Sequence, residues 1–178
     1  MVEQDADSAD LSQKARNIVL RQLSAAPKTR HQLAEKLMQR ELPEDVVSQV
    51  LDRFEEVELI DDAAFAESWV RSRHRSKGLA RRVLSMELRK RGIDEHEAEL
   101  ALEQVSDEDE WNKATELVAR KISRHSVPTS TDPEQRKQRD RMVRRLVGML
   151  SRKGYPLGLA FNVVTDALNA DDLDTLNE

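Results

Sequence analysis

Apolar residues recur every three or four positions along most of the chain, which is the spacing of one face of an α-helix. Before residue 55 this spacing occurs in three runs: Ala15, Ile18, Val19 and Leu23, then Leu33 and Leu37, then Val46, Val47, Val50, Leu51 and Phe54. Pro27 ends the first run, and Pro43 suits the first turn of the third. The pattern therefore predicts three short amphipathic helices in this part of the chain.

Capping residues stand where these helices and later ones should begin. Thr29 followed three positions later by Gln32 is typical of a capping box, and Asp94 with Glu97 repeats the pattern. Asp132 directly before Pro133 is suited to start another helix. These residues predict helix starts at three separate points of the chain.

The same order of apolar positions returns twice. Adding 51 to the residue number takes Ala15, Val19, Leu33, Leu37, Arg40 and Leu42 to Ala66, Val70, Leu84, Leu88, Arg91 and Ile93. Adding 48 takes Ala66 and Val70 on to Ala114 and Val118, and adding 62 takes Leu84, Leu88 and Ile93 on to Leu146, Leu150 and Tyr155. The growing offset indicates an insertion of 14 residues, which we place in the turn-rich stretch 126–133. Repetition near 50 residues is typical of a modular array.

We therefore predict an all-α protein, an elongated array of three tandem three-helix repeats that resemble helix-turn-helix modules. The predicted organisation is an acidic disordered tail over 1–10, repeat 1 over 11–58, repeat 2 over 59–106, repeat 3 over 107–170 with an inserted loop at 126–133, and an acidic tail over 171–178.

Composition agrees with this class and excludes several functions. Of the 178 residues 35% are charged and only 3% are aromatic, which favours a helical protein with a thin core. Cysteine is absent, so disulfides, thiol catalysis and thiolate metal sites are excluded. The sequence has no apolar run long enough for a membrane span, and its acidic start is unlike an export signal. We expect a cytoplasmic protein.

Positive charge is concentrated in two stretches, although the net charge of the chain is −5. Nine Lys and Arg residues lie between Arg71 and Arg91 against one acid, Glu87, and eight lie between Arg136 and Lys153 against one acid, Asp140. Such local excess indicates an anionic partner or an acidic neighbour within the chain. For any single arginine, a solvated helix face is the simpler interpretation.

Catalytic and metal-binding patterns are missing from the sequence. It contains no phosphate-binding glycine loop and no nucleophile elbow, and its four histidines stand apart without metal-ligand spacing. The tryptophans Trp69 and Trp111 fall within helical apolar spacing, so we expect them to pack in the core. We predict neither an enzyme nor a cofactor.

The stretch from Leu59 to Ile93 resembles a known family. An acidic pair after Leu-Ile, a Phe-Ala pair, a V-R-x-R run, a Lys-Gly turn and a basic helix ending in EL-x-K-x-G-I are similar to RecX, the small bacterial regulators of the RecA recombinase. One departure is Glu58, where many members of the family have Gly. The resemblance covers roughly residues 11–169. It implies a protein that binds the RecA filament on DNA and restrains its ATPase, strand exchange and extension in recombination, repair and the SOS response.

The basic residues supply candidate contacts with such a partner, and the predicted set is Arg71, Arg73, Arg75, Lys77, Arg81, Arg82, Arg89, Arg91, Arg141, Arg144 and Arg145. Direct binding to single- or double-stranded DNA is the alternative, because a three-helix unit with a basic later helix is also how helix-turn-helix proteins are built. The stretch 79–91 lacks Asn and Gln, so contact with phosphates is easier to support than base readout. We expect neither a membrane nor a small-molecule partner.

Overall fold

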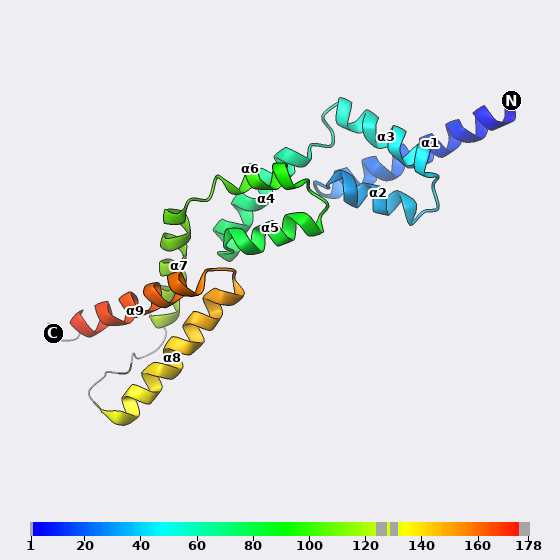
Figure 1. The fold of residues 1–178 in the computed structure, drawn as a ribbon. Coiled ribbons are helices and arrows are strands. Elements are labelled where there is room, and N and C mark those ends of the chain that lie inside the picture. Colours follow the sequence, from blue (N-terminus) through cyan, green and yellow to red (C-terminus); the bar gives the residue numbers. More distant parts are fainter. Residues whose placement is uncertain (1, 124–127, 129–131, 175–178) are drawn as a thin grey trace. The chain divides into compact units, whose positions relative to one another are not determined.

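The fold is known from a computed structural model that describes residues 2–123, 128 and 132–174. Within these ranges the chain forms nine α-helices and no strand (Figure 1). The helices are α1 (Val2–Ala25), α2 (Arg30–Met38), α3 (Glu44–Glu56), α4 (Asp62–Lys77), α5 (Arg81–Lys90), α6 (Glu95–Leu102), α7 (Asp107–Ile122), α8 (Pro133–Arg152) and α9 (Leu157–Asp174). The predicted all-α class is confirmed, and the helices follow one another as three triplets.

The three triplets share one local structure at the end of their second helix. After α2 the N–H of Leu42 donates to the carbonyl of Leu37, and the equivalent bonds run from Ile93 to Leu88 and from Tyr155 to Leu150. A residue with positive φ precedes each donor: Glu41 at 59°, Gly92 at 74° and Gly154 at 98°. This pair of features is the Schellman ending of a helix, in which a left-handed residue lets the next N–H reach a free carbonyl. The end of α3 has the same structure, with Glu58 at 56° and the N–H of Leu59 bonded to the carbonyl of Phe54, but only the second helix ends in this way in all three triplets.

The predicted helix caps are also present. Thr29 and Gln32 form a capping box at the start of α2. Asp94 accepts a hydrogen bond of 2.9 Å from the N–H of His96 in the first turn of α6. Asp132 stands before α8, whose first residue is Pro133. Thr29 and Asp94 thereby satisfy N–H groups that have no partner inside their own helices, whereas the side chain of Asp132 makes no capping hydrogen bond.

Two compact units divide the described chain differently from the repeats. One, called unit 1, contains Met1–Val70 and Ser85–Ala101, and the other, unit 2, contains Arg71–Leu84 and Leu102–Glu178. The division falls inside α4 and inside α5, so the second triplet contributes to both units. The repeat boundaries stay a prediction, as does the elongated form of the array.

Unit 1 has its core among α1, α2 and α3, which contact one another pairwise. The core is formed by fully or nearly buried side chains, namely Ala15, Val19, Leu33, Leu37, Leu42, Val46, Val47, Val50, Leu51, Phe54 and Ile60. Buried Thr29 donates its hydroxyl to the backbone oxygen of Arg91 over 2.7 Å, and Asp62 accepts from the N–H of Arg30 over 2.9 Å. These two bonds attach the start of α2 to the second triplet within the unit.

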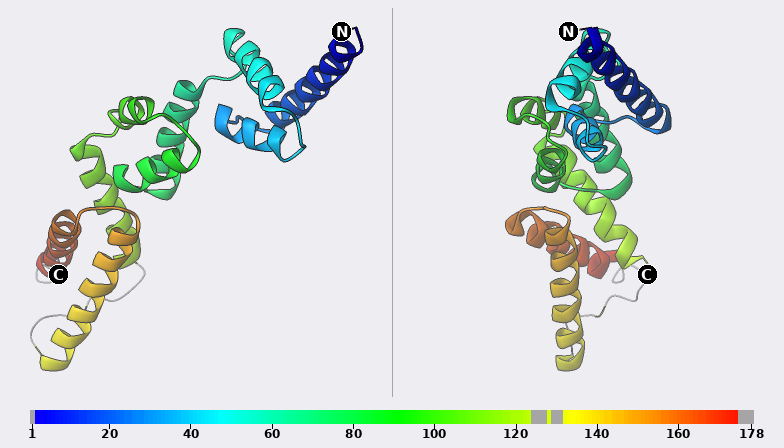
Figure 2. Two further views of the ribbon diagram at one scale, coloured as in Figure 1. Left: turned by 45° about the vertical axis from the view of Figure 1, so that its right-hand side comes forward. Right: turned by 90° about the vertical axis from the view of Figure 1, so that its right-hand side faces the viewer.

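Unit 2 has its core where α9 packs against both α7 and α8 (Figure 2). The buried side chains are Ala80, Ala114, Val118, Ile122, Leu146, Leu150, Tyr155, Ala160, Val163, Val164 and Leu168. Most of these residues lie at the apolar positions of the third repeat. Burial of each leucine or valine side chain contributes about 1.5–3 kcal/mol.

Both ends of the described chain differ from the expectation. α1 begins at Val2, inside the segment 1–10 predicted to be a disordered tail, because residues 2–25 contain neither Gly nor Pro to stop the helix. α9 likewise runs to Asp174, inside the predicted tail 171–178, of which residues 175–178 lie outside the described part. The predicted loop 126–133 also lies mostly outside it, apart from residues 128, 132 and 133.

Candidate partner-binding site

The C-terminal half of α4 presents cationic side chains to solvent. Arg71, Arg75 and Lys77 are exposed, whereas Arg73 is half-buried and engaged in an interaction within the chain. Basic residues in the last turn of a helix are favoured by its dipole, which explains why this charge is tolerated locally. Three positive groups of unit 2 are thus available to an external partner.

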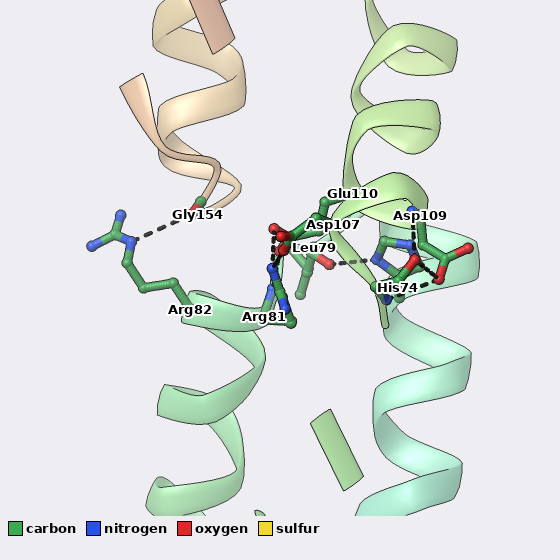
Figure 3. A network of polar contacts seen from close by, with 9 residues as sticks. His74, Leu79, Arg81, Arg82, Asp107, Asp109, Glu110 and Gly154 are labelled. Carbon is green, nitrogen blue, oxygen red and sulfur yellow. Dashed lines mark hydrogen bonds and ion pairs between the residues drawn. The ribbon is translucent and has the colours of Figure 1, made fainter. Parts of the chain in front are cut away.

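Arg81, by contrast, is held by two acids of α7 (Figure 3). Its backbone N–H donates to Oε1 of Glu110 over 2.7 Å, and its Nη2 lies 3.2 Å from Oε2 of Glu110 and also contacts Asp107. Glu110 is only 4% exposed, so these donors replace the water that its carboxylate has lost. The hydrogen bond to Glu110, supported by that to Asp107, raises the pKa of Arg81. The guanidinium therefore serves the packing of α5 on α7.

The turn between α4 and α5 is fixed by the residues that follow α8. Tyr155 is buried and donates its hydroxyl to the carbonyl of Gly78 over 3.1 Å, while Lys153 donates its Nζ to the carbonyl of Lys77. The exposed Arg82 donates Nε to the carbonyl of Gly154 over 3.4 Å (Figure 3). Backbone carbonyls at and after the end of α4, and the carbonyl of Gly154 after α8, are satisfied in this way.

Arg91, which belongs to unit 1, is another candidate contact that has a role within the chain. Its guanidinium carbon lies 3.6 Å from the centroid of the Trp69 ring, and its Nη1 donates to the carbonyl of Glu87 over 2.9 Å. Trp69 is half-buried, donates Nε1 to Oε2 of Glu87 over 2.8 Å and stacks on Phe65. A cation over an indole face is attractive by about 0.5–2 kcal/mol. Arg91 and Trp69 therefore stabilise the contact between α4 and α5.

The two tryptophans do not share one environment. Trp69 is partly buried, but Trp111 is 37% exposed, so the expectation that it packs in the core is wrong. Trp111 lies in the first turns of α7, on the same side of the helix as Ala114 and Val118, so helical spacing alone does not account for its exposure.

The basic residues of α8 lie on its exposed side. Arg141, Arg144 and Arg145 are exposed, and Leu146 and Leu150 are buried on the other side. Arg144 donates Nε to the carbonyl of Asp140 over 3.3 Å within the helix. Three of the eight basic residues counted between Arg136 and Lys153 thus lie on one exposed side of this helix. Arg89, at the end of α5 in unit 1, is exposed and lies 3.9 Å from Glu95.

A cavity of about 550 Å³ lies between the end of α7 and the part of α8 from Gln138 to its last residue, Arg152, in unit 2. Its lining combines basic and apolar side chains: Lys121, Ile122, Pro128, Gln138, Arg141, Met142, Arg145, Leu146, Met149 and Arg152. Two candidate contacts, Arg141 and Arg145, belong to this lining. Sequence spacing alone did not indicate a cavity here.

The buried acid Glu110 was also missed, although the sequence carries a signal for it. Glu110 stands four residues before Ala114 and eight before Val118, at an apolar position of the α7 stripe. An acid at such a position requires a cation or several N–H donors nearby. Asp109 has a different role, because it forms a capping box with Ser106 at the start of α7.

The described residues do not indicate a metal site or a membrane span. Among them, no three His, Cys, Asp or Glu side chains are grouped so that they could hold a metal ion. His74 places Nδ1 at 2.9 Å from the carbonyl of Leu79, which closes the α4–α5 turn, and His125 lies outside the described part. None of the described helices has the length and apolar character needed to cross a bilayer.

The fold and the exposed charge define a class: an all-α array of three-helix modules whose helices present cationic side chains. The family model for RecX, first three-helix domain, matches residues 15–54, and that for RecX, second three-helix domain, matches residues 61–102. The chain belongs to the RecX family.

Relatives and solved structures extend this match over most of the chain. The regulatory protein RecX of Streptomyces coelicolor is 47% identical over 93% of this chain and 84% of its own length. The same protein of Thermobifida fusca is 45% identical over the same shares. The crystal structure of RecX from Lactobacillus salivarius is similar with a TM-score of 0.75 and 25% identity, covering 89% of this chain and 97% of that one. Family and fold together point to a regulatory role and to a protein that is not an enzyme.

Proposed function

We propose that this chain binds the RecA recombinase on DNA and restrains its ATP hydrolysis, its strand exchange and the extension of its filament. The observation that carries the proposal is membership of the RecX family over nearly the whole chain. The function belongs to recombination, DNA repair and the SOS response, and it places the protein in the cytoplasm, where its partner acts. No chemistry of its own is required for this role.

The exposed cations form the proposed binding surface for the RecA filament. We place the first contacts at residues whose charges point to solvent in unit 2, namely Arg71, Arg75, Lys77, Arg141, Arg144 and Arg145. Arg81 and Arg91 are weaker candidates. The guanidinium group of Arg81 already binds Glu110, and that of Arg91 lies over the ring of Trp69. As candidate contacts, Arg73, Arg82 and Arg89 rank between these two groups, since each makes at least one contact within the chain. A polyanionic filament with bound DNA suits such a surface through charge complementarity.

The test measures RecA ATPase on single-stranded DNA at substoichiometric amounts of this protein. The variant combines Arg71→Glu, Arg75→Glu and Lys77→Glu on α4. If each exposed contact contributes about 0.5–1 kcal/mol, the three reversals should raise the half-inhibitory concentration at least tenfold. Far-UV circular dichroism and urea denaturation establish that the variant is folded.

A matched control separates a specific surface from a change in net charge. Lys14→Glu, Arg16→Glu and Arg21→Glu reverse three exposed cations of α1 and alter the net charge equally. This control should keep inhibition within twofold of the unmodified chain. Equal loss in both variants would contradict the placement on α4. Unmodified protein that leaves ATPase and strand exchange unchanged at every dose would refute the proposed function.

Direct DNA binding is measured in the same preparation. Fluorescence anisotropy with naked single- and double-stranded oligonucleotides, repeated over a series of salt concentrations, reports contact with phosphates. Steep loss of affinity with salt, together with no effect on RecA, would favour the alternative that the protein acts on nucleic acid itself.

A further inference from the structure

The cavity of unit 2 shares Arg141 and Arg145 with the surface of the proposed function, but the apolar part of its lining has no role there. Its volume is about 550 Å³, which is large enough for one or two side chains of a bound peptide. The wall comes from the end of α7, from Pro128 and from α8 between Gln138 and Arg152. Because all of these residues lie in unit 2, the cavity is built within one compact body.

Positive charge surrounds the opening. The lining contains four basic residues, Lys121, Arg141, Arg145 and Arg152, and no acid. Beside Arg152, burial lowers the pKa of Lys153, and the charges of Arg120, Lys121 and Lys77 lower it further. The four cations of the lining, with no acid among them, favour a negatively charged ligand.

The floor of the cavity is apolar. Ile122 and Leu146 are 8% and 5% exposed, and the flexible side chains of Met142 and Met149 complete it. Methionine adapts its shape to irregular apolar ligands. An apolar side chain can therefore enter the cavity while acids beside it meet the basic rim.

The lining favours a peptide over a nucleic acid. It contains no aromatic side chain on which a base could stack, and Gln138 is its only side-chain amide. The basic residues of the lining favour an acidic ligand, and the apolar floor favours a ligand with an apolar side chain. We propose that this cavity docks an acidic segment of a partner protein, with one large apolar side chain of that segment inserted between Met142 and Met149. The inference does not depend on the proposed function.

Methionine methyl resonances provide a direct test. The full chain contains five methionines, and two of them, Met142 and Met149, line the cavity. Met38 and Met86 are 51% and 62% exposed elsewhere and serve as internal controls. The probe is a pentapeptide with a central phenylalanine flanked on each side by two aspartates. With ¹³C-methyl-methionine protein, it should shift the two cavity methyl signals saturably and leave the controls in place.

Two changes to the ligand define what is recognised. Replacing the central phenylalanine by alanine should weaken binding at least fivefold, because the floor then loses its apolar partner. An oligothymidine of similar charge should not displace the peptide. Saturable shifts of the cavity methionines by the oligonucleotide at equal or lower concentration would overturn the proposal in favour of a nucleic-acid site.

Substitutions on α8 supply a matched pair. Arg141→Glu with Arg145→Glu should weaken the peptide at least tenfold, whereas Arg144→Glu with Lys137→Glu, which reverses two exposed cations outside the lining, should change affinity less than threefold. Equal weakening in the two variants, or absence of saturable shifts up to millimolar peptide, would overturn the proposal. Inhibition of RecA ATPase is measured separately. Absence of peptide binding would therefore not contradict the proposed function, and absence of ATPase inhibition would not contradict peptide binding.

Discussion

Arg81 is the candidate contact whose removal should cost stability before it costs binding. Replacing it with alanine deletes the guanidinium that lies 3.2 Å from the carboxylate of Glu110, which is 4% exposed. A hydrogen bond to a charged group contributes about 1.5–3 kcal/mol. The Arg81 side chain is 38% exposed, so solvent screening places the loss near the lower end, at about 1.5–2 kcal/mol.

Glu110→Ala should be more severe, because the backbone N–H of Arg81, 2.7 Å from the same carboxylate, loses its acceptor as well. We expect a loss of about 3 kcal/mol for this variant. In the double variant the losses should not add, since both single changes disrupt one network. A coupling energy near zero in this double-mutant cycle would show that the two side chains act independently.

The assay is urea denaturation followed by far-UV circular dichroism, with thermal unfolding as a second measurement. Arg81→Ala should lower the melting temperature by roughly 3–8 °C if unfolding is cooperative. Arg75→Ala is the control, since its exposed side chain should change the free energy of unfolding by less than about 0.5 kcal/mol. Equal stability of the two variants would refute the structural role given to Arg81.

Three further expectations address the repeat, the turn and the aromatic contact. Glu41→Gly should stabilise the chain by about 0.5–1 kcal/mol in urea denaturation, because left-handed backbone costs a non-glycine residue roughly 1–2 kcal/mol, offset by the greater entropy of glycine in the unfolded chain. Burial raises the pKa of Tyr155, so above about pH 10 the unfolded chain loses its proton first and stability should fall as pH rises. Absorbance at 295 nm follows this sole tyrosine, and Tyr155→Phe should abolish its part of the alkaline loss. Arg91→Ala in a Trp111→Phe background should shift the emission of Trp69 to longer wavelength and cost about 1 kcal/mol, whereas unchanged emission would contradict the contact.

Much of this molecule is determined by the sequence alone, because the relevant interactions join residues three to five positions apart. The apolar spacing of the repeats, the capping box of Thr29 and the turn at Gly92 all act within a single helix or its end. The same holds for the exposed side of α8, which follows directly from helical periodicity. The all-α class and the order of the triplets could therefore be predicted.

Tertiary structure decided which charges face outward and which serve the fold. Arg75 and Arg81 look alike in the sequence, yet one is exposed and the other binds an acid 29 residues away. The cavity on α8 and the division into two compact units likewise depend on how distant helices pack. Periodicity shows which side of a helix is apolar, but it does not show which neighbour covers that side. The role of each arginine follows from that neighbour, because a charge near a buried acid is bound within the chain, whereas one facing water remains available to a partner.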